Sequence, residues 1–156
     1  MIEVRAATPA DAVALATLRW EFRAGRDRAV EPRTVFVDRC AEWMRDGLGG
    51  GRWRAWVAVH AGQGGGDARI VGQVWLHLIQ KMPNPIGERE RHAYVSNLYA
   101  QPAERGGVGT LLLQQAIDWA RANGVDRIIL WPSPKSVTLY RRHGFTRDGE
   151  VMELVC

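Results

Sequence analysis

The most informative segment of this chain runs Gln101-Pro102-Ala103-Glu104-Arg105-Gly106-Gly107-Val108-Gly109-Thr110. It follows an apolar, strand-like run at residues 93–100 and leads into an amphipathic helical pattern. Three glycines and an arginine therefore lie at a strand-to-helix turn. Backbone N–H groups at a helix N-terminus have no partner within the helix, and the helix dipole favours an anion there. Because glycine has no Cβ, the oxygens of a phosphate can approach this backbone closely.

Other phosphate-binding patterns fit this turn poorly. The glycines run G-G-x-G rather than G-x-G-x-x-G, and the acidic residue expected about twenty positions after a dinucleotide fingerprint is missing. The lysine of a P-loop is also missing, because Thr110 follows Gly109 directly. A helix start that only needs a tight bend would have the same composition, so this segment alone leaves both interpretations open.

A second segment narrows the choice. Residues 125–131 are a short apolar run typical of a strand, and Ser136 to His143 has the pattern of a short helix closed by Gly144. The two segments together resemble the GNAT family of acyl-CoA-dependent N-acetyltransferases. That family has a strand, a Q/R-x-x-G-x-G/A segment that opens a helix, a further strand and an L-Y-x-x-x-G-F segment. The matching parts of this chain are Glu104-Arg105-Gly106-Gly107-Val108-Gly109 and Leu139-Tyr140-Arg141-Arg142-His143-Gly144-Phe145.

The chain departs from the family pattern in three places. The first motif position, usually Gln or Arg, is Glu104, and Arg105 follows it. A carboxylate that faces a pyrophosphate is repelled by it, so we expect Glu104 to point to solvent and Arg105 to serve the phosphates. Ser133 stands where the family often has asparagine, and Ser136 where alanine is common.

Length and composition fit one globular domain that spans residues 1–156. Hydrophobic residues make up 46% of the chain, which is enough for a sizeable core. No apolar run reaches the roughly 18 residues of a membrane helix, and the N-terminus lacks the pattern of a signal peptide. Cys40 and Cys156 have neither metal-ligand nor redox spacing. We therefore expect a soluble cytoplasmic protein without a metal and without a membrane partner.

The charge balance is basic, with a net charge of +4 and a pI of about 9.6. A basic protein suits an anionic cofactor, and nucleic acid is the other partner that it can attract. The arginines are scattered over residues 19–54, a pattern that equally fits a solvated surface. A nucleic-acid partner is therefore not favoured.

Hydrophobic periodicity predicts the element order β-α-α-β-β-β-α-β-α-β. The expected strands are residues 2–5, 53–60, 70–80, 93–100, 125–131 and 150–155. The expected helices are residues 9–24, 34–46, 108–122 and 136–143. Thr8 is the expected cap of the first helix, residues 63–67 a hairpin loop, and residues 82–90 a loop that borders a substrate. The third helix should bury one stripe, Val108, Leu111, Leu112, Ala116, Trp119 and Ala120.

This order is typical of an α/β or α+β fold. The resemblance implies the GNAT architecture, a mixed, mostly antiparallel central sheet of roughly six to seven strands with helices on both faces. In that architecture the sheet is splayed at strands 4 and 5, so that backbone groups of the fourth strand are exposed. The resemblance also allows a homodimer.

The resemblance further implies that acetyl-CoA (coenzyme A) is the co-substrate. Its pyrophosphate would accept hydrogen bonds from backbone N–H groups of Gly106, Gly107, Val108, Gly109 and Thr110, with Arg105 adding charge. Its pantetheine arm would pair like an added strand with the backbone of Leu98, Tyr99 and Ala100. Ser133 and Ser136 would bond the arm from the other side.

The implied reaction is a direct transfer, in which a neutral primary amine attacks the thioester carbonyl and the thiolate leaves. Tyr140 stands at the family position of the proton donor, and a phenol with a pKa near 10 stays protonated at neutral pH. Asn97 stands near the place where the family often has a Glu that holds an activating water, so Asn97 would position the amine or a water. The candidate bases are Glu21, Glu31, Glu88, Glu90, Asp38 and His92. The candidate walls of the acceptor pocket are Trp20, Glu31, Trp75 and Tyr94.

Three alternatives to an acetyltransferase of small molecules, peptides or proteins stay open. An enzyme that acetylates aminoacyl-tRNA would fit the basic balance. A non-catalytic sensor of acyl-CoA would fit Glu104 and the missing strand carboxylate. A nucleotide-binding module of another fold would need affinity for ATP or NAD, and the motifs do not favour it.

Overall fold

The computed structural model describes residues 1–62, 67–147, 149 and 151–156. Its elements, in chain order, are β1 (Ile2–Ala6), the 3-10 turn η1 (Pro9–Asp11), α1 (Ala12–Ala24), α2 (Arg33–Gly49), β2 (Trp53–His60), β3 (Arg69–Gln80), β4 (Arg91–Ala100), the 3-10 turn η3 (Pro102–Glu104), α3 (Val108–Ala122), β5 (Arg127–Ile129) and α4 (Val137–Arg142). The predicted hairpin loop falls largely on residues 63–66, outside the described residues. No helix of the described residues is long and apolar enough to cross a membrane.

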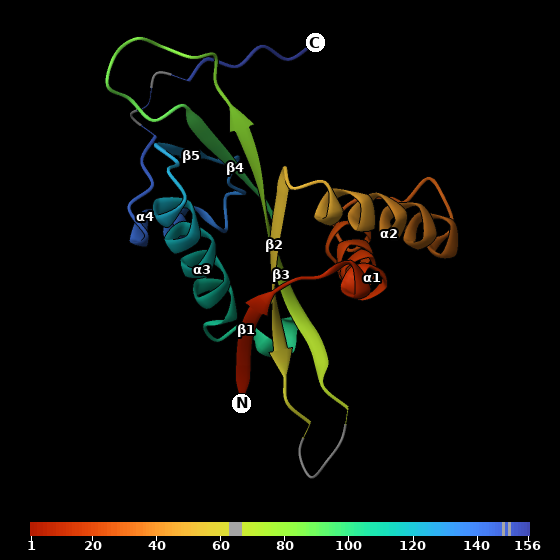
Figure 1. Ribbon diagram of the computed structural model, residues 1–156. Coiled ribbons are helices and arrows are strands. Elements are labelled where there is room, and N and C mark those ends of the chain that lie inside the picture. Colours follow the sequence, from red (N-terminus) through yellow and green to blue (C-terminus); the bar gives the residue numbers. More distant parts are fainter. Residues whose placement is uncertain (63–66, 148, 150) are drawn as a thin grey trace.

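The strands form one mixed sheet in the order β1-β2-β3-β4-β5. The first three pairings are antiparallel, and β4 pairs with β5 in parallel. Helices α1 and α2 lie on one face of the sheet, and α3 and α4 lie on the other (Figure 1). The expected mixed, mostly antiparallel sheet with helices on both faces is therefore confirmed.

Alternation along the strands divides the core into two clusters, one on each face of the sheet. On β3, Val74 and Leu76 pack with α3, whereas Trp75 packs between α1 and α2. Gln73 is a fully buried polar residue of the same strand; its Nε2 donates to the backbone oxygen of Leu15 at 3.0 Å, and its Oε1 accepts from the Trp75 indole at 2.8 Å. The first bond connects α1 to the centre of the sheet, and the second orients the Gln73 amide within β3.

Two helix boundaries differ from the prediction. The first helix opens with the 3-10 turn η1, so its α-helical part begins at Ala12 rather than Pro9. The second continues to Gly49 instead of ending at Asp46, because glycine weakens a helix without preventing one. In the third helix the predicted apolar stripe is wrong at Leu111, which is 48% exposed, while Leu113 and Ile117 are buried instead.

The predicted last strand is not formed by residues 151–156, and Glu150 lies outside the described residues. The sheet of the described residues has five strands rather than six to seven, and β5 covers Arg127–Ile129 rather than 125–131. An alternating apolar pattern forms a strand only where a neighbouring strand can pair with it. Since β5 has only three residues, it offers a short edge for such pairing. The apolar side chains of the C-terminal segment, Val151 among them, are accordingly exposed.

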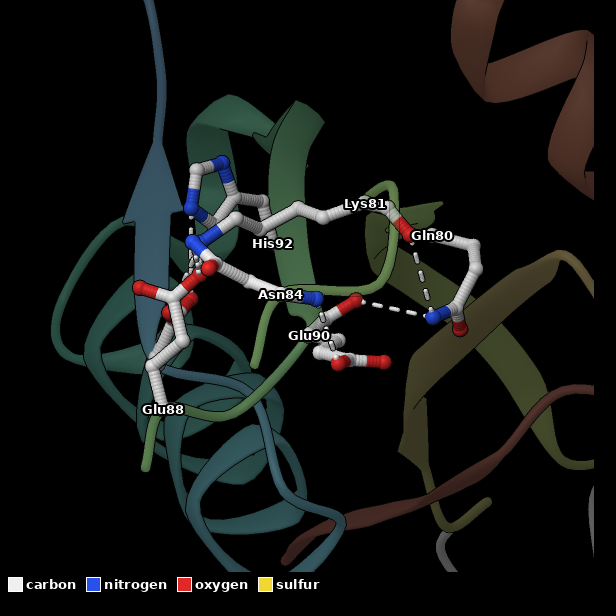
Figure 2. A network of polar contacts seen from close by, with 7 residues as sticks. Gln80, Lys81, Asn84, Glu88, Glu90 and His92 are labelled. Carbon is white, nitrogen blue, oxygen red and sulfur yellow. Dashed lines mark hydrogen bonds and ion pairs between the residues drawn. The ribbon is translucent and has the colours of Figure 1, made fainter. Parts of the chain in front are cut away.

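A polar network joins the starts of β4 and β5 to the end of β3. Lys81 Nζ contacts Glu88 at 3.1 Å and Asp126 at 3.5 Å, and His92 Nε2 lies 3.3 Å from Asp126. Figure 2 shows that Asn84 and Glu90 join the same network. The loop expected to border a substrate is thus held against the end of the sheet where β4 and β5 are paired.

Candidate functional site

The glycine turn forms a cradle of unused backbone donors. The first intrahelical bond of α3 runs from Leu111 N–H to the Gly107 oxygen at 3.0 Å. Within the described residues, no backbone acceptor takes the four preceding N–H groups, which belong to Gly107, Val108, Gly109 and Thr110. The predicted fifth donor, Gly106, already donates to the Glu104 oxygen at 2.9 Å. Four donors therefore point away from the helix, at its positive end.

Open space lies in front of this turn. A Cβ added at Gly106 or Gly107 would meet no heavy atom within 4 Å. Gly107 has φ +130°, a left-handed conformation that favours glycine. Arg105 is exposed beside the turn, where its charge can reach an anion. The cradle thus has the room, the donors and the charge that a phosphate group requires.

Glu104 does not point to solvent as expected. Its carboxylate is 18% exposed, and Arg69 Nη2 lies 3.8 Å from it. Arg69 begins β3, so this ion pair joins residues far apart in the sequence. The pair partly neutralises the negative charge that the motif departure brings to the turn.

The edge of β4 becomes free just before the glycine turn. β4 and β5 pair at His92, Ala93 and Tyr94 alone, although β4 continues to Ala100. The predicted cofactor-binding residues Leu98, Tyr99 and Ala100 therefore lie beyond the last pair with β5. On the other side of β4, Tyr99 and Ala100 are paired with β3. This early end of the pairing with β5 is the predicted splay between strands 4 and 5.

Asn97 lies in an irregularity of β4. The pairing with β3 shifts by one residue, because Gln73 faces Tyr99 whereas Trp75 faces Ser96. Asn97 has φ 56°, and among the described residues no other non-glycine residue has a positive φ. Asparagine tolerates this conformation better than most residues. Its Oδ1 accepts a hydrogen bond from Arg19 Nη1 at 3.2 Å.

Tyr140 reaches the core from α4. Its ring packs edge-on against Phe145, with the ring centroids 5.6 Å apart. Burial raises the pKa of its phenol above the usual value of 10, and the neighbouring Tyr94 raises it further. Tyr94 itself packs edge-on against Trp131, which follows β5. Trp131 and Tyr140 line the same hollow, so Tyr140 lies beside the place where β4 and β5 diverge.

Ser133 and Ser136 form a turn before α4. The Ser133 hydroxyl donates to Ser136 Oγ at 3.0 Å, and the Ser136 hydroxyl donates to the Ser133 backbone oxygen at 3.0 Å. Both hydroxyl oxygens keep acceptor capacity. The two serines are thus hydrogen-bonded to each other, and these bonds stabilise the turn that precedes α4.

The four predicted acceptor residues are not all brought together. Trp20 and Glu31 line a cavity of about 190 Å³ between the end of α1 and the start of α2. The Glu31 carboxylate is paired with Arg39. Trp75 is only 2% exposed and belongs to the core, so it does not form a wall. Tyr94 lies at the strand divergence instead.

Most of the candidate bases are engaged in other contacts. Glu31 pairs with Arg39, Glu88 with Lys81, and His92 with Asp126. Glu90 and Glu21 are hydrogen-bonded to Asn84 N–H and to the Gln101 amide, respectively, and Asp38 is exposed. None of these groups is placed at Tyr140 by the contacts of the described residues.

Sequence reasoning missed Arg19 as a site residue. It is a partly buried member of α1 and contacts Asn97, 78 residues further along the chain. The spacing of α1 does contain the signal, because Arg19 falls on the stripe of Ala12, Leu15 and Ala16, which are all buried. A charge on such a stripe indicates either a buried ion pair or a site.

Comparison with known protein families gives one match, to the model of the acetyltransferase (GNAT) family over residues 18–145. No curated protein sequence matches the chain significantly.

Solved structures share the fold at low sequence identity. One is a predicted acetyltransferase with acetyl-CoA from Clostridium acetobutylicum, with a TM-score of 0.75 and 23% identity over 99% of this chain and 96% of that chain. A GCN5-related N-acetyltransferase from Ralstonia eutropha JMP134 has a TM-score of 0.75 and 22% identity over 99% of both chains. A glucosamine-6-phosphate N-acetyltransferase from Arabidopsis thaliana has a TM-score of 0.69 and 15% identity over 99% of this chain and 98% of that one.

Proposed function

This chain belongs to the acetyltransferase (GNAT) family, and from that premise we propose that it transfers an acetyl group from acetyl-CoA directly to a primary amine of a small molecule, peptide or protein. The observation that carries this proposal is the glycine turn at the start of α3. Its four N–H groups have no backbone acceptor among the described residues and face open space, next to the free edge of β4. A pyrophosphate followed by an extended amide-bearing arm fits this combination.

Each part of the site then has a separate task. Backbone N–H groups of Gly107, Val108, Gly109 and Thr110 bind the pyrophosphate, and Arg105 adds charge. The backbone from Leu98 to Ala100 pairs with the amides of the pantetheine arm, which directs the arm into the splay between β4 and β5. Ser133 and Ser136 bond the arm from the α4 side. Acetyl-CoA supplies a thioester, whose acetyl group is activated toward amines.

Tyr140 supplies the proton that the departing thiolate needs. Because burial raises the pKa of its phenol, the hydroxyl is protonated at neutral pH and can donate. Asn97 lies in the irregular part of β4, beyond the last pair with β5, and its amide positions the attacking amine. The chain contributes positioning and one proton donor, and the amine must arrive neutral.

The proposal is tested by incubating the protein with acetyl-CoA and a panel of primary amines that covers amino acids, polyamines, amino sugars, peptides and lysine-containing proteins. Free CoA thiol and acetylated amine are both measured over time. The expected result is equal release of thiol and product that requires both the protein and one class of amine. Thiol release without acetylated product would indicate hydrolysis and not transfer.

The same experiment separates an enzyme from an acyl-CoA sensor. A sensor would bind acetyl-CoA and leave every amine class unmodified. Charged tRNA is included as one acceptor, at low and high salt, because an enzyme of aminoacyl-tRNA would bind in a salt-sensitive manner. Acetylation restricted to that acceptor would replace the small-molecule and protein acceptors of the proposal.

A further inference from the structure

Arg19 is a charged residue on a face of α1 that otherwise packs inward. Ala12, Leu15 and Ala16 on this face are at most 1% exposed, and Arg19 follows at the next step of the helical spacing. Its partial burial lowers the pKa of the guanidinium, which still stays charged at neutral pH. A partly buried charge is unfavourable unless a partner compensates it, so the question is what compensates Arg19.

The protein itself gives Arg19 two neutral partners, the Asn97 amide and the Phe22 ring, whose centroid lies 5.8 Å from the guanidinium carbon. Arg19 Nη1 donates to the Asn97 amide oxygen at 3.2 Å, and no carboxylate of the described residues forms an ion pair with it. By contrast, Arg23 of α1 and Arg39 of α2 each form an ion pair with a carboxylate. No fully buried polar side-chain atom in the described part of the chain lacks a partner. The unused guanidinium N–H groups are therefore open to solvent, and so to a ligand.

Arg19 also lies beside the proposed point of transfer. Its partner Asn97 is the irregular residue of β4, beyond the last pair with β5. Tyr94, within that last pair, packs edge-on against Trp131, and Trp131 and Tyr140 line one hollow beside β5. The guanidinium of Arg19 and the proposed proton donor therefore both lie near the divergence of β4 from β5, where we place the acceptor amine.

We infer that Arg19 binds a carboxylate of the acceptor, and that the acceptor class is amines that carry a carboxylate close to the nitrogen to be acetylated, as amino acids do. This inference rests on the proposed acetyltransferase function. A guanidinium presents parallel N–H donors that match the two oxygens of a carboxylate. One uncompensated positive charge balances one carboxylate, whereas a phosphate at neutral pH carries about 1.5 to 2 negative charges. The guanidinium of Arg19 therefore matches a carboxylate in both shape and charge.

The same charge selects against other amines. The attacking nitrogen must be neutral, and a nearby cation disfavours an ammonium group. A polyamine brings further positive charges toward Arg19 and is repelled. A carboxylate on the acceptor offsets the charge of Arg19, so an amino acid enters where a polyamine does not.

The inference is tested with matched acceptors and three variants. The acceptors are the common L-amino acids and their α-amides, which differ in the carboxylate, together with O-phosphoethanolamine and spermidine. The variants are Arg19→Gln, which removes the charge, Arg19→Lys, which keeps the charge without the planar fork, and Arg45→Gln, an exposed arginine of α2 that serves as the control. Steady-state kcat and KM are measured from thiol release, and folding is checked by thermal unfolding.

We expect wild type and Arg45→Gln to prefer a carboxylate-bearing acceptor over its amide. In Arg19→Gln the KM for that acceptor should rise about 10- to 100-fold, the range expected for loss of a charge-assisted hydrogen bond. The turnover of the amide by Arg19→Gln should change little. For the carboxylate-bearing acceptor, the KM of Arg19→Lys should lie between the values of wild type and Arg19→Gln. A variant with a merely structural defect would instead lose activity on both acceptors, which contradicts the inference.

Binding of acetyl-CoA, followed separately by thermal unfolding, distinguishes the failure of this inference from the failure of the proposed function. If acetyl-CoA binds and amides, spermidine or the phosphorylated amine are preferred, the acetyltransferase stands and the carboxylate site is wrong. The inference is equally wrong if acetyl-CoA binds and no carboxylate-bearing amine reacts. If acetyl-CoA does not bind, the proposed function falls together with the inference.

Discussion

At the scale of single residues, the proposed chemical step depends on Tyr140. Tyr140→Phe removes only the hydroxyl and keeps the edge-on packing with Phe145. We expect kcat to fall about 100-fold, the lower part of the range for general acid catalysis, because a thiolate is already a fair leaving group. The dissociation constant for acetyl-CoA, measured by calorimetry, should be unchanged. Unaltered turnover with acetyl-CoA bound would remove Tyr140 from the mechanism.

Asp11 governs stability at low pH. Its carboxylate accepts two bonds from Arg5, both 2.9 Å, and one from Thr8 N–H at 2.8 Å. The bonds to Arg5 are the main reason that the pKa of this carboxyl lies below its usual value. A lowered pKa means that its stabilisation is complete above the unfolded-state pKa near 3.9 and is lost as the pH falls through the folded-state pKa.

Asp11→Asn should therefore lower the free energy of unfolding by about 1–2 kcal/mol at pH 7. Wild type and variant should converge as the pH approaches the folded-state pKa. Urea unfolding at several pH values measures both the difference in the free energy of unfolding at pH 7 and its loss at low pH. Asp38→Asn is the matched control, because Asp38 is exposed, and it should follow wild type throughout. A difference between Asp11→Asn and wild type that persists in strong acid would contradict this account.

At the scale of elements, the glycine turn depends on how closely α3 packs on β3 and β4. A Cβ at Gly72 of β3 would lie 3.0 Å from the Tyr99 oxygen and 3.1 Å from atoms of both Val108 and Leu112. These neighbours are backbone and packed side chains, which have little freedom to move. Position 72 therefore sets the distance between the sheet and the first turn of α3.

Gly72→Ala should destabilise the protein by about 1–3 kcal/mol, as overpacking of a core does. It should also weaken acetyl-CoA binding, since the first turn of α3 supplies the phosphate donors. Gly87→Ala is the control, because a Cβ there meets no atom within 4 Å. Thermal unfolding and calorimetry read the two effects. Wild-type stability in Gly72→Ala would show that α3 has more freedom than this packing implies.

The elements also show which predictions local sequence supports. Residues 53–60 are a mostly apolar run that follows three glycines, and β2 has the predicted bounds Trp53–His60. Gly144, the predicted closing residue of the last helix, has φ +88° and lies two residues after Arg142, the last residue of α4. Both are encoded within a few residues. The C-terminal segment has an alternating apolar pattern but does not form a strand. Strand formation also needs a partner strand, which local sequence does not specify.

The residues that sequence reasoning misplaced depend on contacts between distant segments. Glu104 turns to Arg69, and Arg19 turns to Asn97. Trp75 resembles a pocket wall by residue type, and only the packing of α1 and α2 over β3 shows that it is core. The glycine turn and Tyr140 could be located from their motifs, whereas the acceptor side could not, because no local pattern specifies which side chains of separate helices and strands meet.

At the scale of the whole molecule, the sheet separates the proposed cofactor-binding residues from the proposed acceptor-binding residue. The glycine turn and α4 lie on the side of α3, while Arg19 comes from α1 on the opposite side (Figure 1). The divergence of β4 from β5 connects the two sides, and the polar network at Lys81 and Asp126 holds its closed end (Figure 2). Under the proposed function, the acyl donor and the acceptor would approach from opposite faces and meet where β4 and β5 diverge.

The central claim is that the turn at the start of α3 holds acetyl-CoA, and its most direct test is thermal unfolding with and without this ligand. Wild type, Gly106→Ala and Gly49→Ala are compared, with ATP and NAD as control ligands. A Cβ at either glycine meets nothing within 4 Å in the free protein, so both variants should fold. Only Gly106→Ala places a methyl group in the space proposed for the phosphates.

Acetyl-CoA at about a hundred times its dissociation constant should add about 2.7 kcal/mol to the free energy of unfolding of wild type and of Gly49→Ala. Their midpoint temperatures of unfolding should rise accordingly. Gly106→Ala should need about tenfold or more acetyl-CoA for the same rise, and ATP and NAD should not reproduce it. The claim would be contradicted if saturating acetyl-CoA did not raise the midpoint temperature of folded wild-type protein. It would also be contradicted if acetyl-CoA raised the midpoint of Gly106→Ala as much as that of wild type at the same concentration.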